Sequence, residues 1–200
     1  MSGTAVSHAP EEHATNTGIS NNKLLMWTFL ASDCMFFGSL IWVYMAYRGR
    51  SVQGPYPQDV LNIPYTSVSA AVLLLSSLAM VLALHGIQHG NMRRFRVWLA
   101  ATAVLGTLFL GGQYYEFTEF YRHGLSLQQN LFGTTFFVLT GFHGTHVGIG
   151  VIWLLILNLM SFFGKLTPAN AERVEVAGLY WHFVDIVWIV IFTLVYLIPY

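Results

Sequence analysis

Five long apolar stretches divide this chain, and they constrain its fold more than any other feature of the sequence. Each is at least as long as the roughly 20 apolar residues that a helix needs to cross the hydrocarbon layer of a membrane. Backbone amides and carbonyls find no water there, so such stretches form helices or closed barrels, and five strands of this length would not close a barrel. We therefore predict an all-α, polytopic membrane helix bundle with five transmembrane helices, over about residues 24–47, 66–85, 95–115, 131–163 and 174–198.

The composition agrees with a membrane protein. Of the 200 residues, 55% are hydrophobic and only 9% are charged, whereas a soluble chain carries roughly 25% charged residues. The nine basic and nine acidic residues give no net charge, which argues against nucleic acid as a partner because such binding depends on a basic surface. The single cysteine, Cys34, excludes an internal disulfide and a multi-cysteine metal cluster, and we expect it to be a small buried apolar side chain.

The first 22 residues are polar and lack the cationic start and apolar core of a signal peptide. We expect residues 1–22 to form a flexible cytoplasmic tail and residues 23–200 to form the transmembrane domain. Cytoplasmic loops are enriched in Lys and Arg, which sets the orientation. With the N-terminus inside and the C-terminus outside, six basic residues lie on the inner side and three on the outer: Lys23, Arg93, Arg94, Arg96, Lys165 and Arg173 against Arg48, Arg50 and Arg122.

Ionisable side chains at membrane depth are costly, so each one marks a candidate site. The first span holds one acid, the third ends in another, the fourth holds two histidines, and the fifth holds a histidine and an acid near its start: Asp33, Glu116, His143, His146, His182 and Asp185. We expect Asp33 to be an intramembrane acid and the other five residues to form an interhelical polar network. We predict neither a catalytic residue nor a metal site.

The histidine spacings leave alternatives open. His143 and His146 are three residues apart on one helix face, where a metal would need His182 as a third ligand, and we favour interhelical hydrogen bonds over metal binding. Asp185 stands one turn from His182 and could fix its tautomer, either in a proton relay or, as we favour, in helix packing. Asp33 has no basic residue within a turn, so it is either a proton-handling group or a hydrogen-bond donor to another helix.

Four motifs resemble the signature of subunit III of the haem–copper terminal oxidases. They are SDCMFF at 32–37, LFLGGQYYE at 108–116, GTTFFVLTGFHGTHVGIG at 133–150 and YWHFVDIVW at 180–188. The resemblance extends over residues 23–200, and the number of spans is that of the five-helix bacterial form of this family. Two details depart from the family pattern. Asp33 stands where the family has a glutamate, and the loop at 164–173 lacks the family's basic, histidine-containing sequence.

The resemblance implies a non-catalytic subunit of a proton-pumping oxidase in a bacterial plasma membrane. Haem and copper are then expected in partner subunits, with subunit I in direct contact with this chain and with subunit II and small subunits in the same complex. The subunit would hold phospholipid and support proton uptake and turnover stability while the complex reduces oxygen to water. The electrons would come from cytochrome c or, alternatively, from quinol. Three basic residues are candidates for contacts with lipid headgroups, namely Lys165, Arg93 and Arg94.

Two other functions remain as alternatives. A stand-alone membrane b-type cytochrome would bind haem through His143, His146 and His182, but we expect His182 to lie nearer one membrane face than His143. A small proton-coupled carrier would use Asp33 and Asp185, but carriers of this kind usually show internal repeats and broken helices. The sequence shows neither feature clearly.

Overall fold

The computed structural model describes residues 18–51, 61–128 and 130–198. Five helices within these ranges are long and apolar enough to cross a membrane, which confirms the predicted all-α architecture. They are α1 (Asn21–Tyr47), α3 (Ile63–Gln88), α4 (Met92–Arg122), α5 (Leu131–Phe162) and α6 (Ala171–Phe192). A 3₁₀ turn (Pro168–Asn170) precedes α6 and a π-helical turn (Thr193–Leu197) continues it. Most of the predicted tail, residues 1–17, lies outside the described residues.

Several helices extend beyond the predicted spans. Asparagine side chains fix three of the helix starts: Asn62 accepts the Tyr65 amide, Asn91 the Arg94 amide and Asn130 the Gly133 amide. Such N-caps satisfy one of the amides that have no partner within the first helical turn. The largest extension is at the end of α4, which runs to Arg122. Glu116, expected at the end of its helix, therefore lies inside it.

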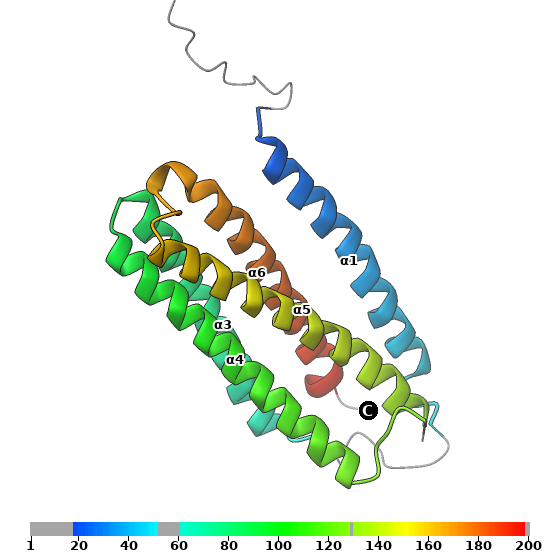
Figure 1. Cartoon of the computed structure of the whole chain (residues 1–200). Helices are drawn as coiled ribbons and strands as arrows, with labels where there is room; N and C mark the ends of the chain where they lie inside the picture. The colour runs from blue at the N-terminus through cyan, green and yellow to red at the C-terminus, as the bar shows by residue number, and fades with distance from the viewer. Residues whose placement is uncertain (1–17, 52–60, 129, 199–200) are drawn as a thin grey trace, which may run out of the picture.

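Four of the helices form a bundle, and α1 packs on its outside. In this bundle α3 lies beside α4 and α6, and α5 also lies beside α4 and α6. Helix α1 runs along one side and contacts α5 and α6 (Figure 1). The N-terminal end of α1, the α3–α4 turn and the α5–α6 connection lie at one end of the molecule (Figure 1). We call this end the α1-start end.

The centre of the bundle is built around one tryptophan. Trp181 of α6 is 1% exposed and donates its indole N–H to Ser76 Oγ of α3 at 3.0 Å. Two glycines leave the space for its ring, Gly106 on α4 and Gly150 on α5. A Cβ atom would lie 2.5 Å from Trp181 Cη2 at Gly106 and 2.9 Å from Cε3 at Gly150. Side chains of ordinary size at these positions would not fit without moving the indole.

Helix α1 contributes a narrow stripe of buried side chains to the packing. The stripe repeats at helical spacing, and it consists of Met26, Leu30, Asp33, Phe37 and Tyr44. Polar contacts hold both ends of the helix. Ser20 hydrogen-bonds Glu172 and Lys23 pairs with Glu175 at 2.7 Å, while the Arg48 guanidinium donates to the Ile198 carbonyl at 2.5 Å.

Most of the remaining α1 surface is exposed, including Cys34. The expectation that Cys34 is buried is therefore wrong. Its helix has one packed face, and Cys34 does not lie on it.

The space around Trp181 generates a stability prediction. We expect Gly106→Ala to lower the free energy of unfolding by about 1–3 kcal/mol, because the added methyl group collides with the indole and with Val151. The matched control is Gly111→Ala on the same helix, where a Cβ atom meets nothing within 4 Å. That substitution is expected to stabilise the helix by about 0.5–1 kcal/mol. Unfolding in mixed detergent micelles measures both, and equal effects would contradict the packing described.

Candidate functional site

The intramembrane acid Asp33 meets a histidine of another helix. Its Oδ2 atom lies 3.4 Å from Nε2 of His146 on α5, and both side chains are largely buried at 11% and 16% exposure. The other ring nitrogen of His146, Nδ1, donates to the Phe142 carbonyl at 2.7 Å. Phe37 packs edge-on against the imidazole. Asp33 thus has a basic neighbour across the α1–α5 interface, although none stands near it in the sequence.

His143 points to a different helix from His146. It is fully buried, and its Nε2 donates to the Val184 carbonyl of α6 at 3.1 Å. Its ring stacks on Trp188 at 4.9 Å and packs edge-on against Phe109. The two histidines that share a helix face in the sequence therefore make two separate contacts, one to α1 and one to α6.

His182 and Asp185 meet at a serine of α3. The Ser77 hydroxyl lies 2.5 Å from Nδ1 of His182, and the Asp185 carboxylate lies close to the same hydroxyl. Asp185 is 5% exposed, and His182 is half-buried. These contacts join α6 to α3.

The expected depth of His182 is wrong. We expected it nearer a membrane face than His143, but it lies close to the middle of α6 and its π-helical continuation, two residues before the carbonyl that His143 contacts. Helix α6 begins earlier than predicted. Its first turns include the polar residues Glu172, Arg173 and Glu175, which an apolar span does not include. His143 and His182 therefore lie at similar depth in the bundle. They differ in their partners, because His143 bonds a carbonyl of α6 and His182 contacts a serine of α3.

Glu116 joins three elements towards the opposite end of the molecule. Thr66 of α3 donates its hydroxyl to Glu116 Oε1 at 2.5 Å, and the phenol of Tyr196 in the π-helical turn lies close to this carboxylate. The Glu116 side chain is buried, at 6% exposure. The carboxylate therefore connects α3, α4 and the end of α6.

Sequence reasoning missed several polar contacts between α4 and α5. Gln113 donates to the Thr140 carbonyl at 3.3 Å. The Arg96 guanidinium donates to Ser161 Oγ and to the Ser161 carbonyl at 2.9 and 2.8 Å, and Asn158 donates to the Arg96 carbonyl. The accepting groups in these hydrogen bonds are neutral, so the sequence does not mark them and only the structure identifies the pairs.

No metal site emerges from the described ranges, in which no three His, Cys, Asp or Glu side chains lie close enough to hold an ion. The arrangement instead serves helix–helix contact. The ionisable groups of the bundle connect α1 to α5, α5 to α6, α6 to α3 and α3 to α4. Interhelical polar contacts of this kind help to hold helices together in a membrane.

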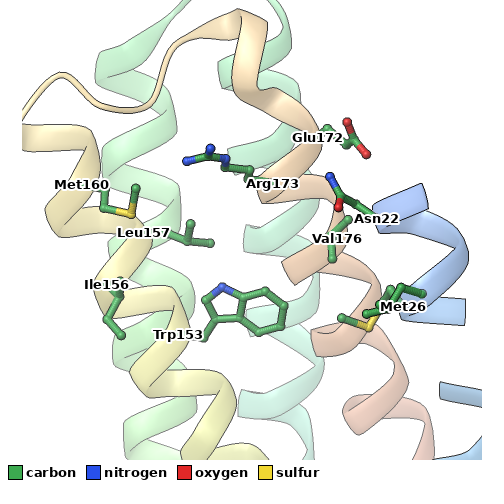
Figure 2. A pocket seen from close by; sticks show the side chains of 10 residues that line it. Asn22, Met26, Trp153, Ile156, Leu157, Met160, Glu172, Arg173 and Val176 are labelled. Carbon is green, nitrogen blue, oxygen red and sulfur yellow. The ribbon is translucent and has the colours of Figure 1, made fainter. Parts of the chain in front are cut away.

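A cavity of about 540 Å³ opens between α1, α5 and α6 at the α1-start end. We call it the α1-start pocket. Its wall is mainly apolar and includes Met26, Trp153 and Leu157, while Asn22, Glu172 and Arg173 line its polar mouth. Figure 2 shows Arg173 extending from α6 above Trp153 and Leu157. The predicted headgroup contacts, Lys165, Arg93 and Arg94, are exposed and do not line this pocket.

Comparison with known proteins identifies a family. A sequence profile described as cytochrome c oxidase subunit III matches residues 7–200. Cytochrome c oxidase subunit 3 of Bacillus sp. strain PS3 is 36% identical over 189 residues, 94% of this chain and 91% of the relative. Quinol oxidase subunit 3 of Bacillus spizizenii is 35% identical over 191 residues, 96% and 93% of the two chains. Cytochrome bo(3) ubiquinol oxidase subunit 3 of Pseudomonas aeruginosa is 36% identical over 186 residues, 93% and 88% of the two chains.

The contact between Asp33 and His146 generates the second prediction. In a double-mutant cycle with Asp33→Asn and His146→Gln, we expect a coupling free energy between about 0.6 kcal/mol, the average for polar contacts between membrane helices, and about 1.7 kcal/mol, their maximum. The measurement is unfolding of the whole chain in mixed micelles. As a control, Asp33→Asn combined with His182→Gln should be additive within about 0.5 kcal/mol, because His182 bonds Ser77 and not Asp33. Additivity in the first cycle would show that the contact contributes nothing.

Proposed function

This chain belongs to the cytochrome c oxidase subunit III family, and we propose that it is a non-catalytic subunit of a proton-pumping oxidase. As subunit III of a haem–copper oxidase it is part of a respiratory complex, with partner subunits, and a multi-pass protein of the bacterial plasma membrane. In the proposed role, haem and copper reside in those partners, and the complex as a whole reduces oxygen to water. This chain packs directly on subunit I, beside subunit II and small subunits.

One observation carries the proposed non-catalytic role. Most of the ionisable side chains at membrane depth contact groups of neighbouring helices, and His143 and Asp185 are buried in the bundle interior. Contacts of this kind fix the positions of neighbouring helices relative to one another. In the proposed role the bundle shapes the proton-entry side of subunit I and prolongs its working life during turnover.

The proposed orientation places the α1-start end in the cytoplasm. The helix bounds bring the basic residues of α1, of the α3–α4 turn and of the α5–α6 connection to this end of the molecule (Figure 1). They are Lys23, Arg93, Arg94, Arg96, Lys165 and Arg173. An excess of Lys and Arg on one side is typical of the cytoplasmic side of a membrane protein. The N-terminus is then inside and the C-terminus outside.

We propose that the α1-start pocket holds an anionic phospholipid. Its apolar wall of Met26, Trp153 and Leu157 suits an acyl chain. Arg173 stands at the polar mouth, and within the described part of the chain its guanidinium has neither an ion-pair nor a hydrogen-bond partner. A guanidinium binds phosphate in a bidentate geometry, which suits a lipid headgroup. Lys165, Arg93 and Arg94 are exposed at the same end of the molecule and are available for further headgroup contacts.

For the electron donor we propose cytochrome c, with quinol as the alternative. The relatives include a cytochrome c oxidase subunit at 36% identity and quinol oxidase subunits at 35% and 36% identity. In the proposed role the donor binds to subunits I and II, so either donor is compatible with the same subunit III.

Removal of this subunit tests the proposed function. An oxidase assembled without this chain should show unchanged haem spectra and unchanged initial oxygen uptake, but its activity should decay several-fold faster during continuous turnover. The reason is that the chain contributes no redox centre and supports proton uptake from outside the catalytic core. The measurement is oxygen consumption followed until it stops. An unchanged turnover lifetime would contradict the role, and loss of the haem signals would contradict the non-catalytic assignment.

A variant arm of the same experiment tests the lipid. Oxidase with Arg173→Gln should retain less anionic phospholipid by mass spectrometry and should show a shortened turnover lifetime. The matched control is Arg122→Gln at the opposite end, where the arginine contacts Glu119 at 3.5 Å and is mostly exposed. Equal lipid content in the two variants would remove Arg173 from the proposal.

A further inference from the structure

We propose that a cavity between the start of α3 and the end of α4 binds a primary alkylammonium group, with the carboxylate of Glu116 as its counter-charge. We call it the Glu116 cavity. It lies where α4 ends, at the end of the molecule opposite the α1-start end (Figure 1). The inference goes beyond the proposed function, because it concerns a second site of opposite charge and does not depend on partner subunits.

The Glu116 cavity has the size and the wall of a small-molecule site. Its volume is about 660 Å³, within the range of about 300–1,000 Å³ that is usual for ligand pockets. Aromatic rings and two carboxylates line it, namely Tyr65, Tyr115 and Phe120 with Glu116 and Glu119. Among the described residues, no Lys or Arg belongs to this wall. The wall therefore suits a cation, and a bare metal ion would fill little of the volume.

Glu116 is the buried acid of this cavity. Its side chain is 6% exposed, and Oε1 accepts the Thr66 hydroxyl at 2.5 Å. In the part of the chain that the structure describes, no basic side chain forms an ion pair with Glu116. An ionised carboxylate removed from water is costly unless a cation or further hydrogen-bond donors compensate it. An ammonium group in the cavity supplies both the charge and the donors.

The second acid contributes less, because it already has partners. Glu119 is 41% exposed, and its carboxylate lies 3.4 Å from His123 Nε2 and 3.5 Å from Arg122 Nη1. Exposed pairs of this kind are weak, so Glu119 remains able to accept a hydrogen bond from a ligand at the exposed edge of the cavity. One full negative charge, that of Glu116, is left without a cation, and it matches a ligand with a single positive charge.

Two tyrosine rings lie beside these acids. The ring centroids of Tyr65 and Tyr115 are 5.8 Å apart, with the planes tilted by 51°. The Tyr65 hydroxyl donates to the Gly112 carbonyl at 3.2 Å, which holds its ring in place. Aromatic faces attract ammonium groups through the ring quadrupole, and carboxylates accept their N–H groups. A primary ammonium on an alkyl chain uses both kinds of wall.

The same group has two sources at this level of the membrane. Helix α4 has 31 residues, more than the roughly 20 that cross the hydrocarbon layer, so its last turns reach the headgroups. Tyr115 and Tyr121 are 59% and 72% exposed on these turns, and tyrosines are enriched at the membrane–water interface. An ethanolamine headgroup offers a primary ammonium there, and a soluble amine offers the same group from the aqueous phase.

Native mass spectrometry of the full chain in a gentle detergent measures the binding. The probes are phosphatidylethanolamine, phosphatidylcholine and ethylammonium. We expect phosphatidylethanolamine to bind several-fold more tightly than phosphatidylcholine, whose ammonium has no N–H to donate. If only the lipid binds, the ligand is the headgroup, and if ethylammonium binds as tightly as the lipid, it is a soluble amine. Equal binding of the two lipids, or no binding of either amine, would overturn the inference.

Variants locate the binding. Glu116→Gln should weaken it about tenfold or more, because it removes a hydrogen bond between charged groups while keeping an oxygen for Thr66. Tyr115→Leu should weaken it about two- to fivefold through loss of one aromatic face. The matched control is Tyr114→Leu, at the neighbouring residue, which is 77% exposed and does not line the cavity. Because Tyr115 is also exposed, this pair decides the question even if Glu116→Gln does not fold.

A last variant separates this site from the lipid proposed for the α1-start pocket. Arg173→Gln, at the other end of the molecule, should leave the binding of phosphatidylethanolamine unchanged. If Arg173→Gln abolishes this binding and the Tyr115 and Glu116 variants do not, the inference is wrong while the α1-start pocket keeps its lipid. Failure of the chain to join an oxidase would contradict the proposed function and leave this result as it stands.

Discussion

The rest of the structure depends on one constraint, namely that an ionisable side chain at membrane depth is costly and therefore faces protein. In water these groups would be solvated and their positions would matter little. In the bundle, each engaged ionisable side chain specifies a neighbour. Asp33 faces His146, His143 donates to the Val184 carbonyl, and His182 contacts Ser77. These contacts fix which helices are adjacent, and the apolar packing around Trp181 fills the space that they define.

The constraint also explains the position of α1. This helix packs through one stripe, and the polar groups along it are held at the two ends and at Asp33 in the middle. Because the contact is narrow, space remains beside it for the α1-start pocket, which α5 and α6 complete. The proposed lipid and the attachment of α1 are therefore linked, since Glu172 lines the mouth of the pocket and also hydrogen-bonds Ser20 before α1.

The sequence predicts the five spans and the residues that matter at membrane depth, because apolar length and isolated charge are local properties. It does not predict the pairing. His143 and His146 share a face in the sequence, yet one turn is enough to direct them to different helices. The partner of His143 is a backbone carbonyl and that of His182 is a serine, and neither carries a sequence signal. The depth of His182 was misjudged because α6 begins within a polar segment, and Cys34 was misjudged because nothing local shows that α1 has a single packed face.

The most direct test of the account is isolation of this chain through a tag on its N-terminal segment in a gentle detergent. The eluate is examined by a reduced-minus-oxidised spectrum and by oxygen uptake with reduced cytochrome c and with quinol. The account predicts haem signals from co-purifying subunits and oxygen uptake, and the more effective donor identifies the type of oxidase. A colourless chain isolated alone would contradict membership of an oxidase complex, and a red chain isolated alone would show that it binds haem itself.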